Sequence, residues 1–185
     1  MVLAAGCGGD DDEAAQGDRT ERFERTPLRQ PGESGTLDES VCERVRAREV
    51  ARAVRRPDVR LEARPNDSLD LSICQWEGPG LRVQMYADTA PRAQLRFYNQ
   101  LAEQLQFFNA DPQRRPYQLK GVGQDSAYGG AGAWWTRTKS QLVAYSKNRI
   151  LRIRVLGRGF GDAAKRRAAA RLGRLGFRRL SVPAS

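Results

Sequence analysis

The residues of this chain that could do chemistry are its cysteines, its carboxylates and its many arginines. The chain has 185 residues, with 32 Lys+Arg, 22 Asp+Glu and no His. Without His it has no His-activated nucleophile and no imidazole metal ligand. The carboxylates that could serve acid–base chemistry fall on separate predicted elements: Asp70, Glu77, Asp125 and Asp162. We therefore expect a binding protein with no cofactor, no metal and no catalytic residues, and keep a His-free carboxylate-based hydrolase as the minor alternative.

Cys7 is preceded by Leu3-Ala4-Ala5-Gly6, small residues that resemble the lipobox of bacterial lipoproteins. That resemblance implies lipidation of Cys7, with residues 1–7 as the end of a signal peptide. A signal peptide needs an apolar stretch of about 7–15 residues, so we expect the natural chain to begin further upstream. The alternative is a disordered cytosolic start with a stray cysteine.

Residues 8–37 are predicted to be a disordered acidic linker. Residues 1–37 hold eight acids and four Arg, which leaves fourteen acids and twenty-eight bases, a net charge of +14, for residues 38–185. The linker has too few apolar residues to offset the entropy of ordering it. As a flexible coil it would span roughly 30 Å, enough to hold a domain away from a lipid surface.

The other two cysteines, Cys42 and Cys74, fall inside the predicted domain. If the chain is exported, two cysteines in one small domain most simply form a disulfide. Closing a loop of about 32 residues would stabilise the fold by roughly 3–4 kcal/mol. Zinc is the weaker alternative, because neither cysteine has a second Cys or a His nearby at ligand spacing.

Hydrophobic periodicity, caps and turns predict three helices and seven strands. The helices are expected over 39–55, 91–108 and 162–177. The strands are expected over 59–63, 69–76, 81–86, 117–122, 133–138, 141–145 and 150–156. This order predicts one α+β domain over 38–180, with an antiparallel sheet of two hairpin or meander units, helices packed mainly on one face, and a tail over 181–185.

Several motifs resemble those of the actinobacterial secreted lipoproteins of unknown function. They are Cys42 on the first helix, the strand motif Cys74-Gln75-Trp76, and the turn Gly121-Val122-Gly123 followed by Ala127-Tyr128. A more distant similarity is to extracytoplasmic sensor domains of actinobacterial Ser/Thr kinases. The resemblance implies a Cys42–Cys74 disulfide and a place in the cell envelope. The chain differs from the family at Arg55-Arg56-Pro57, and the acidic residue of the turn is displaced to Asp125.

The arginines of the last strand and last helix are the candidate binding residues. Alternation places Arg152 and Arg154 on one side of the strand, and helical spacing leaves an outer row on the helix. We expect these residues to form a basic face for an anionic lipid, a phosphate-bearing wall polymer or an acidic protein. A purely solubilising surface is the alternative, and nucleic acid is not an expected partner. The helix row consists of Arg166, Arg167, Arg171 and Arg174.

Two further motifs could bind small molecules. Trp134 and Trp135 are adjacent in a strand, so they point to opposite faces, and an exposed one could floor an apolar ligand site. The run 157–161 (Gly-Arg-Gly-Phe-Gly) imitates a dinucleotide-binding loop, but no parallel strand can follow it, so we interpret it as a turn into the last helix. The expected protein is a monomeric, lipid-anchored binding or sensing domain on the outer side of the cell membrane.

Overall fold

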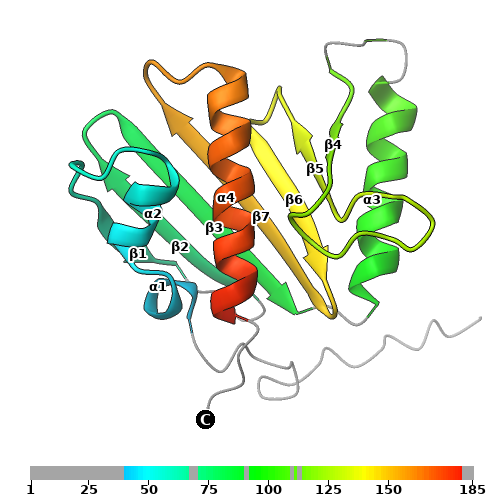
Figure 1. The fold of residues 1–185 in the computed structure, drawn as a ribbon, viewed down its shortest axis with the longest axis horizontal. Helices are drawn as coiled ribbons and strands as arrows, with labels where there is room; N and C mark the ends of the chain where they lie inside the picture. The colour runs from blue at the N-terminus through cyan, green and yellow to red at the C-terminus, as the bar shows by residue number, and fades with distance from the viewer. Residues whose placement is uncertain (1–39, 67–70, 90–91, 109–110, 112–113, 181–185) are drawn as a thin grey trace, which may run out of the picture.

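The structure is a computed structural model that describes residues 40–66, 71–89, 92–108, 111 and 114–180. It forms one antiparallel sheet with helices on both faces (Figure 1). The described strands are β1 (Glu62–Pro65), β2 (Leu71–Gly78), β3 (Leu81–Thr89), β4 (Tyr117–Leu119), β5 (Ala133–Thr136), β6 (Gln141–Ser146) and β7 (Arg149–Gly157). The described helices are α1 (Val41–Arg44), α2 (Ala47–Ala53), α3 (Ala93–Phe108) and α4 (Asp162–Leu180). The α+β class is therefore as predicted.

The sheet is continuous, with strand order β1-β2-β3-β7-β6-β5-β4. The prediction of two hairpin or meander units differs from the structure, because pairing of β3 with β7 joins the two halves into one seven-stranded sheet. Met85 lies opposite Ile153 and Val83 opposite Val155. All four side chains are fully buried, so joining the halves gives one uninterrupted apolar face.

The predicted first helix is two helices, which brings the described total to four instead of three. The chain breaks at Val45, whose backbone is extended, and a second capping arrangement restarts it: the Glu49 carboxylate accepts the Arg46 N–H at 3.0 Å. In an unbroken helix, Val45 and Val50 would point about 140° apart. The break lets both side chains reach the core, where each is fully buried.

The main core lies between the sheet and the helices α1, α2 and α4, which stand in front of it in Figure 1. α4 comes unusually close to the strands, because glycines face them. A Cβ on Gly173 would lie 2.7 Å from Val122 Cγ1, and one on Gly176 would lie 2.8 Å from Leu151 Cδ1. The sequence therefore places glycine where a methyl group would collide with Val122 in the turn after β4 or with Leu151 on β7.

The amphipathic helix α3 covers the opposite face of the sheet, over β6 and the start of β7. Phe97 is the centre of this second core: its ring lies 4.7 Å from that of Tyr145 and 6.5 Å from that of Trp134. Three helices thus share one face and one helix takes the other, in agreement with helices mainly on one face.

Several helices and strands have bounds that differ from the predicted ones. β1 starts three residues later than predicted and β4 ends three residues earlier, while α4 continues to Leu180. β4 ends early because Gly121 takes a positive φ of 68° and Val122 then turns into the main core. The predicted leader, linker and tail fall outside the described residues. None of the helices formed by the described residues has the length and hydropathy of a membrane-spanning segment.

Candidate functional site: an arginine-lined cavity between α2 and α4

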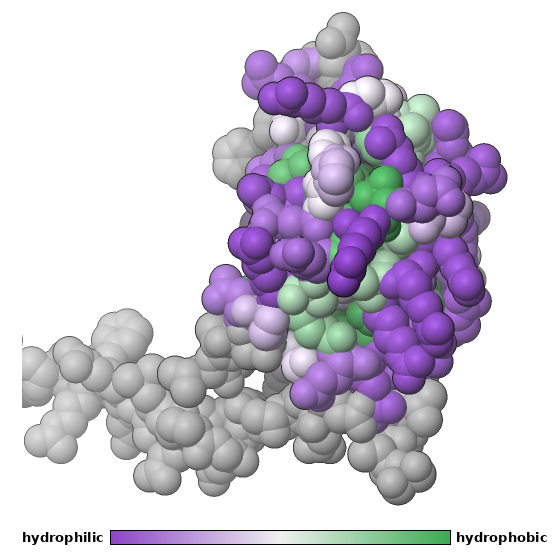
Figure 2. Space-filling model, turned by 90° about the vertical axis from the view of Figure 1, so that its left-hand side faces the viewer, coloured by the Kyte–Doolittle hydropathy of each residue, from purple (hydrophilic) through white to green (hydrophobic). Residues whose placement is uncertain are grey.

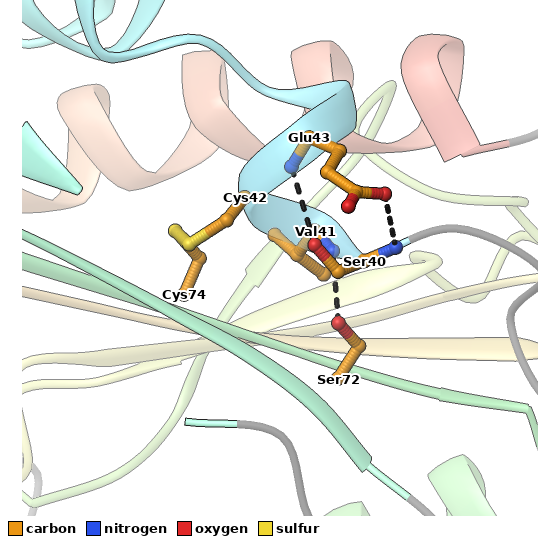
Figure 3. The surroundings of a disulfide bond; sticks show 6 residues. All are labelled: Ser40, Val41, Cys42, Glu43, Ser72 and Cys74. Atoms are coloured by element: carbon orange, nitrogen blue, oxygen red, sulfur yellow. Dashed lines mark hydrogen bonds between the residues drawn. A yellow bond between two sulfur atoms is a disulfide. The ribbon is translucent and has the colours of Figure 1, made fainter. Parts of the chain in front are cut away.

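The predicted cysteine pair is bonded. Cys42 on α1 and Cys74 on β2 form a disulfide with their Cα atoms 5.1 Å apart (Figure 3). Close by, the Ser72 hydroxyl accepts the Val41 N–H at 2.8 Å, and Ser40 and Glu43 close a capping box around the first turn. The disulfide is therefore one of several links that hold α1 against β2.

The arginines predicted to form one basic face are divided between the two faces of the sheet. Arg152 and Arg154 lie on the face that α3 partly covers, and Arg154 sits in a polar row between Gln84 and Gln141. The arginines of α4 lie on the other side, beyond the main core. The six predicted residues therefore do not form one surface.

The arginine side chains of α4 point in two directions. Arg166 turns toward β4, where its guanidinium stacks on the Tyr117 ring at 4.5 Å. Arg167, Arg171 and Arg174 line cavities on the flank that faces α2. Stacking takes Arg166 out of the group that could meet a ligand on the α2 side.

α2 supplies further arginines from its C-terminal end. The Arg55 N–H donates to Arg52 O and the Arg56 N–H to Ala51 O, which is the Schellman pattern. Arg55 holds the left-handed position of this motif, with φ 61°. Arg56 stacks on the Phe160 ring at 4.9 Å, so its guanidinium is held in place.

Arg171 connects the two helices. Its Nε donates to the Ala53 carbonyl at 2.5 Å, which satisfies one of the open carbonyls at the end of α2. Burial, and then the charges of Arg55, Arg167 and Arg174, lower the pKa of Arg171. The guanidinium group of Arg171 is therefore close enough to three other guanidinium groups to be repelled by their charges. We call the set Arg55, Arg56, Arg167, Arg171 and Arg174 the arginine cluster.

Four members of the arginine cluster, all except Arg174, line a cavity of about 240 Å³ that we call the α2–α4 cavity. Its other walls are Val54, Gly159, Phe160 and Ala164. A neighbouring cavity of about 320 Å³ shares Arg171 and continues along α4 past Arg174 and Arg178. Figure 2 shows the adjoining edge of the molecule, where hydrophilic side chains surround a smaller apolar strip.

Within the described residues, no carboxylate lines the α2–α4 cavity or pairs with the arginine cluster. Glu49 lines the neighbouring cavity and pairs with Arg179. Burial alone would raise the pKa of Glu49, but the hydrogen bonds from Arg179 and the Arg46 backbone lower it. Glu49 thus pairs with Arg179, and no carboxylate of the described residues forms an ion pair with the arginine cluster.

A larger depression of about 760 Å³ lies at the β2–β3 turn, but its charges largely cancel. Glu77 pairs with Arg82, and its carboxylate also lies 3.4 Å from Arg64. Because its acids and bases neutralise each other, this depression has no comparable preference for an ion.

Neither tryptophan offers a surface platform for a ligand. Trp135 is fully buried in the main core, where its Nε1 donates to Asp162 Oδ1 at 3.0 Å. Trp134 is 5% exposed beneath α3. The two rings point to opposite faces as predicted, and a helix covers each one.

Two of the remaining candidate carboxylates, Asp125 and Asp162, make hydrogen bonds that stabilise the fold. Asp125 accepts N–H bonds from Gly121 and Gly132, at 3.0 and 2.7 Å, so it closes the glycine turn. Asp162 begins α4 and binds the Trp135 indole, and Asp70 lies outside the described residues. The run 157–161 forms a turn into α4, with Gly159 at φ 78°, as predicted from the sequence.

The cluster residues that our sequence reasoning missed as binding candidates are Arg55 and Arg56. Their signature was visible as Arg55-Arg56-Pro57, basic residues at the end of a helix. Which surface that helix end would meet depends on contacts between residues more than one hundred positions apart, as between Ala53 and Arg171.

Comparison of the chain with protein families, with curated proteins and with solved structures gives no match. Among the described residues, no group of three or more His, Cys, Asp or Glu could hold a metal ion.

Proposed function

We propose that this protein is a lipid-anchored, extracytoplasmic binding domain that recognises an anionic component of the bacterial cell envelope. The observation that carries the proposal is the arginine cluster, in which four of the five arginines line one cavity whose described lining residues include no carboxylate. Such an arrangement attracts anions over a distance and offers them paired hydrogen-bond donors on contact. The Cys42–Cys74 disulfide supports an oxidising compartment.

The anion-binding part is tested with vesicles that contain anionic lipid and the full 185-residue chain. We expect binding at low salt that falls steeply as salt rises, because the Debye length drops from about 10 Å at 0.1 M to about 3 Å at 1 M. Arg167→Glu with Arg174→Glu should abolish binding. Arg115→Glu with Lys120→Glu changes the net charge equally near β4, at the opposite edge of the sheet, and should leave most of it. Absence of binding at low salt would refute this part.

The anchor is tested separately, on Cys7. With an upstream signal sequence supplied, the chain should partition into the detergent phase, and Cys7→Ser should move it to the aqueous phase. Equal partitioning of the two proteins would refute lipidation and leave the arginine cluster untouched.

A further inference from the structure

We infer that the α2–α4 cavity is a discrete site for a single phosphate group, with Arg55, Arg56, Arg167 and Arg171 as its ligands. This inference rests on the proposed function and deepens it, because it replaces a diffuse attraction by a site with a defined chemistry. A phosphate on a lipid headgroup and a free phosphate ion share that chemistry.

The directions from which the arginines approach favour a phosphate over a carboxylate. Arg55 and Arg56 come from the end of α2, while Arg167 and Arg171 come from successive turns of α4, so the cavity has donors on two walls. A carboxylate offers two oxygens in one plane, whereas a phosphate group offers three terminal oxygens and up to two charges. Guanidinium forks on two walls match the phosphate geometry.

Two of the four side chains are held in place before any ligand arrives. Arg171 is tied to the Ala53 carbonyl, and Arg56 rests on the Phe160 ring. Arginine otherwise loses considerable side-chain entropy when it is ordered on a ligand. Because Arg171 and Arg56 are already ordered in the free protein, ligand binding loses less side-chain entropy and is therefore tighter.

Repulsion among the cluster residues gives a second reason for affinity. The charges of Arg55, Arg167 and Arg174 each act on Arg171, and none of these residues forms an ion pair with a carboxylate of the described part of the chain. An anion in the cavity would offset this repulsion, because every guanidinium group is attracted to it. The cavity volume of about 240 Å³ leaves room for a phosphate group with attached waters.

The test is a calorimetric titration of the oxidised full chain with inorganic phosphate, at constant ionic strength set by chloride. We expect saturable binding of one phosphate per chain. Arg55→Gln and Arg167→Gln should each weaken it about tenfold or more, because each removes charge-assisted hydrogen bonds. Arg115→Gln and Arg178→Gln remove the same charge outside the cavity and should change the affinity less than about twofold.

Thermal unfolding of all four variants controls for folding, since each replaces an exposed arginine. A titration that never saturates, or equal weakening by all four variants, would overturn the site. If anionic vesicles still bind in a salt-dependent way, the proposed function survives that result. Saturable phosphate binding without any vesicle binding would keep the site and assign it to a free phosphate ion instead of a lipid headgroup.

Discussion

Arg55 occupies a backbone position that glycine fills in most helices that end this way. A left-handed conformation costs an ordinary residue about 1–2 kcal/mol, and glycine avoids this cost at some loss of entropy. Arg55 therefore keeps a side chain at the rim of the α2–α4 cavity at the expense of the helix end.

We predict that Arg55→Gly raises the free energy of unfolding by about 0.5–1 kcal/mol while it weakens phosphate binding. Urea unfolding measures the first effect and calorimetry the second. Arg55→Ala is the matched control, because it removes the same charge and keeps the strained backbone. If both variants gain the same stability, charge repulsion and not backbone strain is the cause.

Tyr145 lies in the second core beneath α3 and is 1% exposed. Burial, and then the neighbouring Tyr98, raise the pKa of its phenol to about 12. An unfolded tyrosine loses its proton near pH 10. Between these two values the unfolded chain has released the proton and the folded chain still holds it, so stability falls as pH rises.

We predict that this fall amounts to about 1.4 kcal/mol per pH unit between pH 10 and 12, and that Tyr145→Phe lacks it. Denaturant unfolding at pH 9, 10 and 11 gives the difference between the two proteins, which should shrink with pH. Tyr128→Phe changes a fully exposed phenol and should run parallel to the wild type. Parallel curves for Tyr145→Phe would contradict the prediction.

At the scale of the elements, the packing of α4 depends on two glycines that differ in their neighbours. Val122 faces Gly173, and a β-branched side chain is stiff, whereas Leu151 and Met85 face Gly176 with flexible ends. We predict that Gly173→Ala lowers the free energy of unfolding by about 1–3 kcal/mol and that Gly176→Ala costs less. Urea unfolding measures both. A gain of about 1 kcal/mol in each, as helix propensity alone would give, would show that α4 can move away from the sheet.

The link between α1 and β2 is the second test at this scale. We predict that Cys42→Ala with Cys74→Ala lowers the free energy of unfolding by about 3–4 kcal/mol, because the bond restricts a loop of about 32 residues in the unfolded chain. Chemical reduction of the wild type should give the same loss. A loss below about 1 kcal/mol would show that the remaining contacts of α1 suffice.

The sequence predicted those elements whose pattern is local. α3 has apolar residues at spacings of three and four, and the structure forms it within two residues of the expected start. The break at Val45 was missed because the valines there continue a plausible helical stripe. Its cause, the burial of both Val45 and Val50, belongs to the tertiary structure.

For the whole molecule, the sequence predicted class and alternation but not long-range pairing. β3 and β7 begin 68 positions apart, and no local sequence pattern predicts that they pair. For the same reason, alternation correctly put Arg152 and Arg154 on one side of their strand, but it could not tell which side α4 would take. The candidate site depends on that information, since α2 and α4 meet only in the folded protein.

The Cys42–Cys74 bond also determines how the domain would carry a mechanical load. A pull on the chain ahead of Val41 would otherwise act first on a helix of four residues and peel it away from the sheet. The bond passes the tension from Cys42 directly into β2, a strand paired on both sides. Force applied at this end would then be shared by the hydrogen bonds of the sheet, and α1 would stay packed against β2.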